Sequence, residues 1–141
     1  MAAADLNSIR ATIEGRLATE LANSPAIPVV FHNMAYEPTP NSSWVQCLTT
    51  FGAGEYLGHG LATSSRNRIV GLVVINIFSG KGVGPGANLV IGKRIRDLNN
   101  SVIVSGVFFD APSGPEVLAS PSPEGYFQTQ VRVTFECIEE L

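Results

Sequence analysis

The chain has 141 residues, a formal net charge of −3 and only 15% charged residues, against roughly 25% in an average soluble domain. This length suits one domain with a sizeable core that needs no disulfide or metal to fold. The acidic balance argues against a bulk cationic nucleic-acid binder, and the 45% hydrophobic content argues against wholesale disorder. Because the surface carries so few charges, we expect part of it to contact other chains.

The first half of the chain predicts one helix followed by two strands. Isoleucine and leucine recur at helical spacing over residues 6–22, and the opposite face of this helix is small and nearly uncharged. Strands are predicted at residues 28–33 and 43–51, the second with clear alternation of its two faces. Prolines predict a loop at 34–41, and glycines predict a connection at 52–67.

The second half predicts a long strand, a helix and two further strands. Residues 68–79 are apolar on both faces, as in a central strand, and they precede a helix at about 86–98. A strand is predicted at 101–110, and prolines predict a loop at 111–125. Residues 126–138 alternate most regularly, with phenylalanine, valine and cysteine on one face and polar residues on the other.

These elements predict one α+β domain of order α-β-β-β-α-β-β. Its sheet would be mainly antiparallel, with about four to five strands and both helices packed on one side. Residues 1–5 show neither a basic nor an apolar run, so we expect no signal peptide, and the apolar run 69–78 is too short to cross a membrane. Cys47 and Cys137 fall in predicted strands, where buried free thiols are expected.

The glycine run at residues 80–86 is the segment most similar to a ligand-binding loop. It fails the Walker pattern, because Lys93 follows a glycine but precedes Arg94 rather than a serine or threonine. Residues 82–87 match the loose dinucleotide pattern, yet Pro85 lacks the N–H that a phosphate cradle uses. We expect a strand-to-helix turn, or a glycine-rich loop that becomes ordered on assembly, rather than a nucleotide site.

The histidines and hydroxyl residues give no catalytic or metal-binding pattern. His32 falls in a predicted strand and His59 in a glycine-rich connection, without the ligand spacing of a zinc site. No serine or cysteine has a histidine base and an orienting residue at a recognisable spacing. We therefore expect no enzyme activity, no cofactor and no metal.

Charges are sorted by sign along the chain. Residues 66–97 carry a net charge of +5, and residues 98–141 carry a net charge of −5. The basic group of the second helix is open to three interpretations: a solvated face, a partner for the acidic last strand of a neighbouring subunit, or a nucleic-acid contact. A head-to-tail contact of this kind can close into a ring. The candidate subunit-interface residues are Ala11, Gly15, Ala18, Lys93, Arg94, Arg96, Glu136 and Glu139.

Several short segments, together with the order of the elements, form a recognisable pattern: Ile9-Arg10, Ile13, 27–33, Trp44-Val45, 68–78, 80–86 and 125–133. This pattern resembles the small tail-terminator proteins of tailed bacteriophages, including a related group of phage tail domains of unknown function. The family pattern often places a glycine in the central strand and a glycine–aromatic pair before the last strand.

The resemblance implies a single domain over residues 1–141 that assembles as a hexameric ring in the virion, at the head-proximal end of the tail, after synthesis in the host cytoplasm. Such rings cap the tail tube, stop its polymerisation and join the tail to the neck. The implied partners are a second copy of this chain, the tube protein and a neck protein, with no membrane partner, while DNA passes through without specific binding. The candidate tube- or neck-facing loop residues are Gly54, Glu55, Tyr56, His59, Pro115 and Glu116.

Two alternatives stay open. A head–tail joining protein or another minor tail protein would share the assembly chemistry but not the termination of the tube. A small ligand-binding or enzymatic domain would instead use the loop at residues 80–86.

Overall fold

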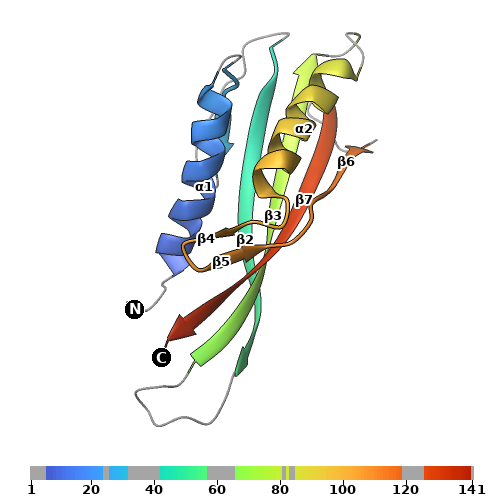
Figure 1. Ribbon diagram of the computed structural model, residues 1–141. Coiled ribbons are helices and arrows are strands. Elements are labelled where there is room, and N and C mark those ends of the chain that lie inside the picture. The colour runs from blue at the N-terminus through green and yellow to red at the C-terminus, as the bar shows by residue number, and fades with distance from the viewer. Residues whose placement is uncertain are drawn as a thin grey trace.

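The computed structural model describes residues 6–23, 26–31, 42–56, 66–80, 82, 85–118 and 126–140. Two helices and seven strands follow one another in the order α-β-β-β-α-β-β-β-β (Figure 1). Their bounds are α1 Leu6–Ala22, β1 Val29–Phe31, β2 Trp44–Tyr56, β3 Arg66–Gly80, α2 Gly86–Asn99, β4 Ile103–Val104, β5 Val107–Phe109, β6 Ser113–Leu118 and β7 Tyr126–Glu140. No helix in the described ranges is long and apolar enough to span a membrane.

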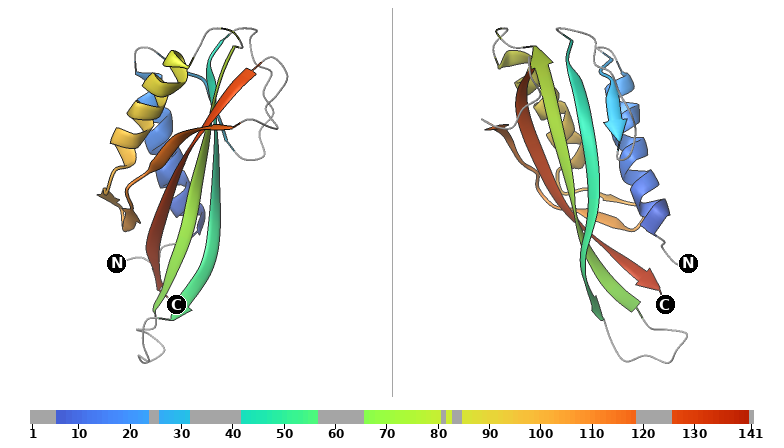
Figure 2. Two further views of the ribbon diagram at one scale, coloured as in Figure 1. Left: turned by 90° about the vertical axis from the view of Figure 1, so that its right-hand side faces the viewer. Right: turned by 180° about the vertical axis from the view of Figure 1, so that it is seen from behind.

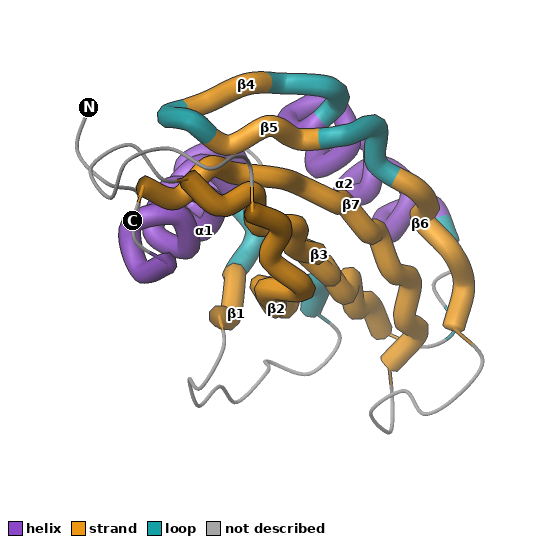
Figure 3. The backbone as a smooth tube through the Cα atoms, turned by 90° about the horizontal axis from the view of Figure 1, so that it is seen from below, coloured by secondary structure: helices purple, strands orange, loops and turns teal. Residues whose placement is uncertain are grey.

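One mixed sheet contains all seven strands, in the order β1-β2-β3-β7-β5-β4, with β6 also paired to β7 (Figure 3). The β1–β2 pair is parallel and the other pairs are antiparallel. The long strands β2, β3 and β7 form its centre. β2 pairs with β3 from Trp44↔Phe78 to Tyr56↔Asn67, and β3 pairs with β7 from Arg66↔Glu140 to Gly80↔Tyr126. The fold is therefore α+β with a mostly antiparallel sheet, as the sequence predicts.

Both helices lie on the same face of the sheet, antiparallel to each other, and none of the described residues forms a helix on the opposite face (Figures 1 and 2). The apolar stripe of α1 is buried against the sheet, with Leu17 2% and Leu21 0% exposed. Val131, Val133 and Phe135 of β7 are fully buried on the same side, because alternate residues of a strand point to opposite faces. We call the outer surface of the helices the front surface and the helix-free face of the sheet the back surface.

The prediction of four to five strands is wrong, because short strands occupy segments that were assigned otherwise. The single strand expected at 101–110 is a hairpin, β4–β5, in which Ser105 (φ 49°) and Gly106 (φ 80°) form the turn. Two consecutive residues with positive φ match the natural twist of a two-residue hairpin. Nothing in the apolar pattern of this segment separates the two halves.

The two segments expected to be loops also contain strand residues. Gly54, Glu55 and Tyr56 extend β2, because a bulge between Phe51 and Gly54 lets the strand continue past the glycines. Pro115 and Glu116 lie in β6, which pairs with the edge of β7 through a second irregularity, where a proline is tolerated. The assignment of these five residues to loops is therefore wrong.

Candidate functional site

The outer face of α1 is uncovered in the single chain, as its composition predicts. Ala11 and Gly15 are exposed and Ala18 is half-buried. A Cβ atom added at Gly15 would meet nothing within 4 Å. Because these side chains are so small, α1 presents a smooth ridge that another backbone could approach closely.

Grooves run along both flanks of this ridge. One groove, of about 550 Å³, lies between α1 and the β4–β5 hairpin, with Thr19 on one wall and Val104 on the other. The second, of about 390 Å³, lies between α1 and β1, with Ala22 and Phe31 among its lining residues. The ridge and its two grooves together form an uncovered surface along α1.

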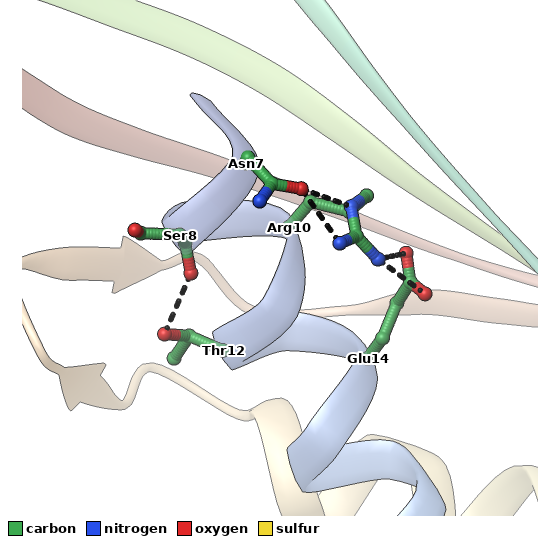
Figure 4. A network of polar contacts seen from close by, with 5 residues as sticks. All are labelled: Asn7, Ser8, Arg10, Thr12 and Glu14. Carbon is green, nitrogen blue, oxygen red and sulfur yellow. Dashed lines mark hydrogen bonds and ion pairs between the residues drawn. The ribbon is translucent and has the colours of Figure 1, made fainter. Parts of the chain in front are cut away.

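In the first half of α1, the charges of Arg10 and Glu14 are paired within the helix itself (Figure 4). Arg10 Nη1 lies 2.9 Å from Glu14 Oε1, and Arg10 Nη2 donates to Asn7 Oδ1 at 2.7 Å. Thr12 Oγ1 donates to the Ser8 carbonyl at 3.0 Å. These are neighbours one helical turn apart, so the charged side chains lie beside one another along the helix.

Two arginines hold the helices together, because each bonds to a backbone carbonyl near the C-terminal end of the other helix: Arg94 of α2 bonds to α1, and Arg16 of α1 bonds to α2. Arg94 Nη2 of α2 donates to the Glu20 carbonyl of α1 at 2.6 Å, and Arg94 Nε lies 3.4 Å from Glu20 Oε1. In return, Arg16 Nη2 of α1 donates to the Leu98 carbonyl of α2 at 2.9 Å. Cations are favourable where the last carbonyls of a helix lack partners.

Arg16 is also packed against the core. Its guanidinium carbon lies 5.4 Å from the centre of the Phe109 ring, and burial lowers the pKa of Arg16 from its ordinary value. Both arginines therefore join the two helices within the chain, and a role for Arg94 in a subunit contact stays a prediction. The sequence predicts no contact between Arg16 and Leu98, which are 82 residues apart.

The other charged candidates do not meet within the chain. Lys93 Nζ pairs with Asp97 Oδ1 at 2.7 Å, and Arg96 Nη1 donates to the Gly114 carbonyl at 2.6 Å, both on the front surface. Glu136 Oε2 lies 2.8 Å from Arg68 Nη2 on the back surface. Glu139 is paired with Asn67 through the backbone, and its side chain, like all of His59, falls outside the described residues.

A polar row that the sequence did not single out crosses the back surface. Asn76 of β3 is its centre: its Oδ1 accepts from Gln128 Nε2 at 3.0 Å and from Gln130 Nε2 at 2.9 Å, and its Nδ2 donates to Gln46 Oε1 at 3.1 Å. Asn76 and Gln128 are buried. The available signal was one amide in each of β2 and β3 and two at alternate positions of β7, but only the pairing of these strands shows that the amides bind one another.

An aromatic cluster closes the same row at one end. The rings of Trp44 and Phe78 stack with centroids 4.2 Å apart, and Tyr126 meets Trp44 edge-on at 6.1 Å. Edge-to-face and offset-stacked geometries are the favourable ones for aromatic pairs. At this end of the back surface, the amide side chains are hydrogen-bonded to one another and the aromatic rings are packed together.

Cys47 and Cys137 are buried free thiols, as predicted. Burial, together with the charge of Glu14, raises the pKa of Cys47 to about 12. Because the thiolate is the reactive form of cysteine, Cys47 is not a nucleophile at neutral pH.

The glycine run joins β3 to α2, and the first turn of α2 that follows it packs against the sheet. Asn88 in the first turn of α2 is 0% exposed. Its Nδ2 donates to the carbonyls of Ile77 and Phe127 and to Thr129 Oγ1, at 3.1 to 3.3 Å. The start of α2 is thereby attached to the ends of β3 and β7. Residues 81, 83 and 84 fall outside the described part.

No protein-family model matches the chain, and no curated protein matches it. Among solved structures, a protein whose name states no function superposes with a TM-score of 0.68 at 17% sequence identity. The match covers 94% of this chain and 95% of that one. At so low an identity the likeness shows that the α+β fold is shared over nearly the whole length of both chains.

Proposed function

We propose that this protein is a phage tail terminator that acts by assembly rather than by chemistry. Its subunits form a closed ring that caps the tail tube, prevents the addition of further tube subunits and joins the tail to the neck in the virion. The proposal rests on the segments that resemble tail terminators and on the small, uncharged outer face of α1.

The observation that best supports assembly is the uncovered outer face of α1. Gly15 costs about 1 kcal/mol relative to alanine in a helix interior, and nothing in the chain occupies the space beside it. A helix face without charge or bulk is poorly suited to a purely solvated role. It is well suited to close contact with another backbone.

The mechanism follows from the two unlike surfaces of a ring. One side matches the symmetry of the tube and binds its last layer, while the other side presents a different surface to the neck. Because no tube subunit fits that second surface, elongation ends. Such a role requires no catalytic residue, and DNA would pass through the opening without base-specific contacts.

The test combines light scattering after size exclusion with electron microscopy of the protein alone and with tube protein. The wild-type chain is expected to form rings and to halt tube growth. Gly15→Leu and Ala11→Lys are expected to prevent one or both, whereas Gly15→Ala keeps the face small and should assemble normally. Rings that bind a neck protein but leave tube growth unchanged would instead indicate a head–tail joining protein.

A further inference from the structure

The exposed large apolar side chains of the described residues gather in two patches on opposite sides of the molecule. Eight such side chains are exposed, and only Leu6, at the start of α1, lies outside both patches. The back patch consists of Val70, Ile103, Phe108 and Ile138, and the front patch consists of Leu89, Val90 and Val117. Apolar groups that cluster in this way mark contact surfaces, whereas scattered ones need no explanation.

The back patch is one continuous row across four strands. Ile103 of β4 pairs with Phe108 of β5, Phe108 pairs with Glu136 of β7, and Glu136 pairs with Val70 of β3. Ile138 follows on the same face of β7, two residues after Glu136. Since neighbouring strands lie about 4.8 Å apart, these side chains form a contiguous surface.

The front patch lies between α2 and β6. Leu89 and Pro115 line a groove of about 390 Å³ on this side. Val117 pairs with Thr129, which faces the helices, so Val117 lies on the front side of β6. Leu89 and Val90 are 50% and 60% exposed on the outer side of α2.

Each patch carries one charge that has no ion-pair partner among the described residues, and the two charges are of opposite sign. On the back, Asp110 Oδ2 accepts only the Thr134 hydroxyl, at 2.7 Å. On the front, Arg96 donates to the Gly114 carbonyl. The neighbouring charges are already paired, Arg68 with Glu136 on the back and Lys93 with Asp97 on the front, and Arg132 Nε donates to Gln130 nearer the amide row.

We propose that the back patch of one subunit binds the front patch of the next copy, with Asp110 of one subunit opposite Arg96 of its neighbour. This front-to-back contact rests on the proposed ring and identifies two surfaces that take part in it besides the outer face of α1. A second copy is the occupant because one chain supplies both apolar patches and both complementary charges. A contact between two different surfaces is head-to-tail and closes into a ring where the rotation between copies allows it, whereas back-to-back pairing would join two surfaces that both carry Asp110.

A charge exchange tests the contact. Asp110→Arg and Arg96→Glu should each raise the apparent dissociation constant of the ring by about tenfold or more at low salt, because like charges then oppose each other. The double variant should return to within about threefold of the wild-type value, because the attraction is restored with its sign exchanged. The double variant, which keeps the net charge of the wild-type chain, is also the control for a nonspecific charge effect, and the thermal unfolding of each variant shows that it is folded.

Cross-linking gives a second, independent readout. With a flexible bismaleimide, Phe108→Cys combined with Val90→Cys should yield ladders up to the full ring, while either single variant should remain uncrosslinked. The native cysteines are each 1% exposed and should not react. Dimers formed by Phe108→Cys alone would show back-to-back pairing and overturn the proposal.

The outcomes separate this contact from the proposed function. If the wild-type chain forms rings that cap tubes, and both single charge variants assemble normally, the contact is wrong and the function stands. If the charge variants keep the ring but no longer cap tubes, the patches bind tube protein and the contact is again wrong. A wild-type chain that forms no ring and caps no tube would overturn both.

Discussion

Gly71 in the centre of β3 is the position where a single methyl group should damage the fold most clearly. A Cβ atom there would lie 2.2 Å from Cζ and 2.6 Å from Cε1 of Phe135, and 2.7 Å from the Thr50 carbonyl oxygen. Carbon atoms in contact normally stand about 3.5–4.0 Å apart. Phe135 has no exposed surface and meets the Phe51 ring edge-on at 5.8 Å, so its own ring cannot move away without displacing a second one.

We therefore expect Gly71→Ala to lower the free energy of unfolding by about 3 kcal/mol, the upper part of the range for overpacked cores. Urea denaturation of the wild type and the variant measures this difference directly. Gly15→Ala is the control, because its added methyl group meets nothing within 4 Å and should raise stability by about 1 kcal/mol. A Gly71→Ala protein as stable as the wild type would refute the packing described for β3 and β7.

Two further substitutions or treatments test the interhelical cap and the buried thiol. Arg94→Ala should lower the free energy of unfolding by about 1–2 kcal/mol, because it removes the bonds to Glu20. Lys93→Ala is the control: it breaks an exposed ion pair and should lower the free energy of unfolding by at most about 0.5 kcal/mol. Equal losses for the two variants in urea titrations would contradict the cap. Cys47 should resist alkylation in the folded protein at pH 8. The pKa of Cys47 is raised from 9.0 to about 12 in the folded protein. Its contribution to the free energy of unfolding is therefore fully present below pH 9 and should be lost between pH 9 and 12, by up to about 1.4 kcal/mol per pH unit. If a Cys47→Ala variant loses stability over the same pH range by the same amount, Cys47 is not the cause of the loss.

Long elements with strong periodicity were predictable from the sequence. Ile9, Ile13, Leu17 and Leu21 repeat at helical spacing and are all buried in α1, and the alternation of β7 matches its observed burial. In both cases one face is buried along the whole element, so the spacing of the apolar residues indicates directly which side chains are buried. The free thiols and the single helical face of the sheet followed from the same patterns.

The short strands were not predictable, because their pairing depends on distant residues. β4 has two residues and β5 has three, too few for a period to show. β6 contains Pro115, a residue that argues against a strand unless the strand lies at an edge. Its position beside β7 comes from the tertiary structure alone.

The candidate surfaces could be predicted only in part, because some of them join residues that are distant in the sequence. The small residues of α1 are adjacent on one helix face, so their exposure could be inferred. The bond between Arg94 and Glu20 could not be inferred from the sequence, because the two residues lie 74 positions apart. The back patch joins residues from four strands, and neither their adjacency nor the position of Asp110 beside them is visible before the register is known.

Electron microscopy of the purified chain, alone and mixed with polymerising tail-tube protein, tests the central proposal most directly. The proposal predicts closed rings of uniform size, seen both free in solution and at one end of tubes that have stopped growing. A chain that remains monomeric at every concentration, and in whose presence tubes elongate as they do without it, would contradict it.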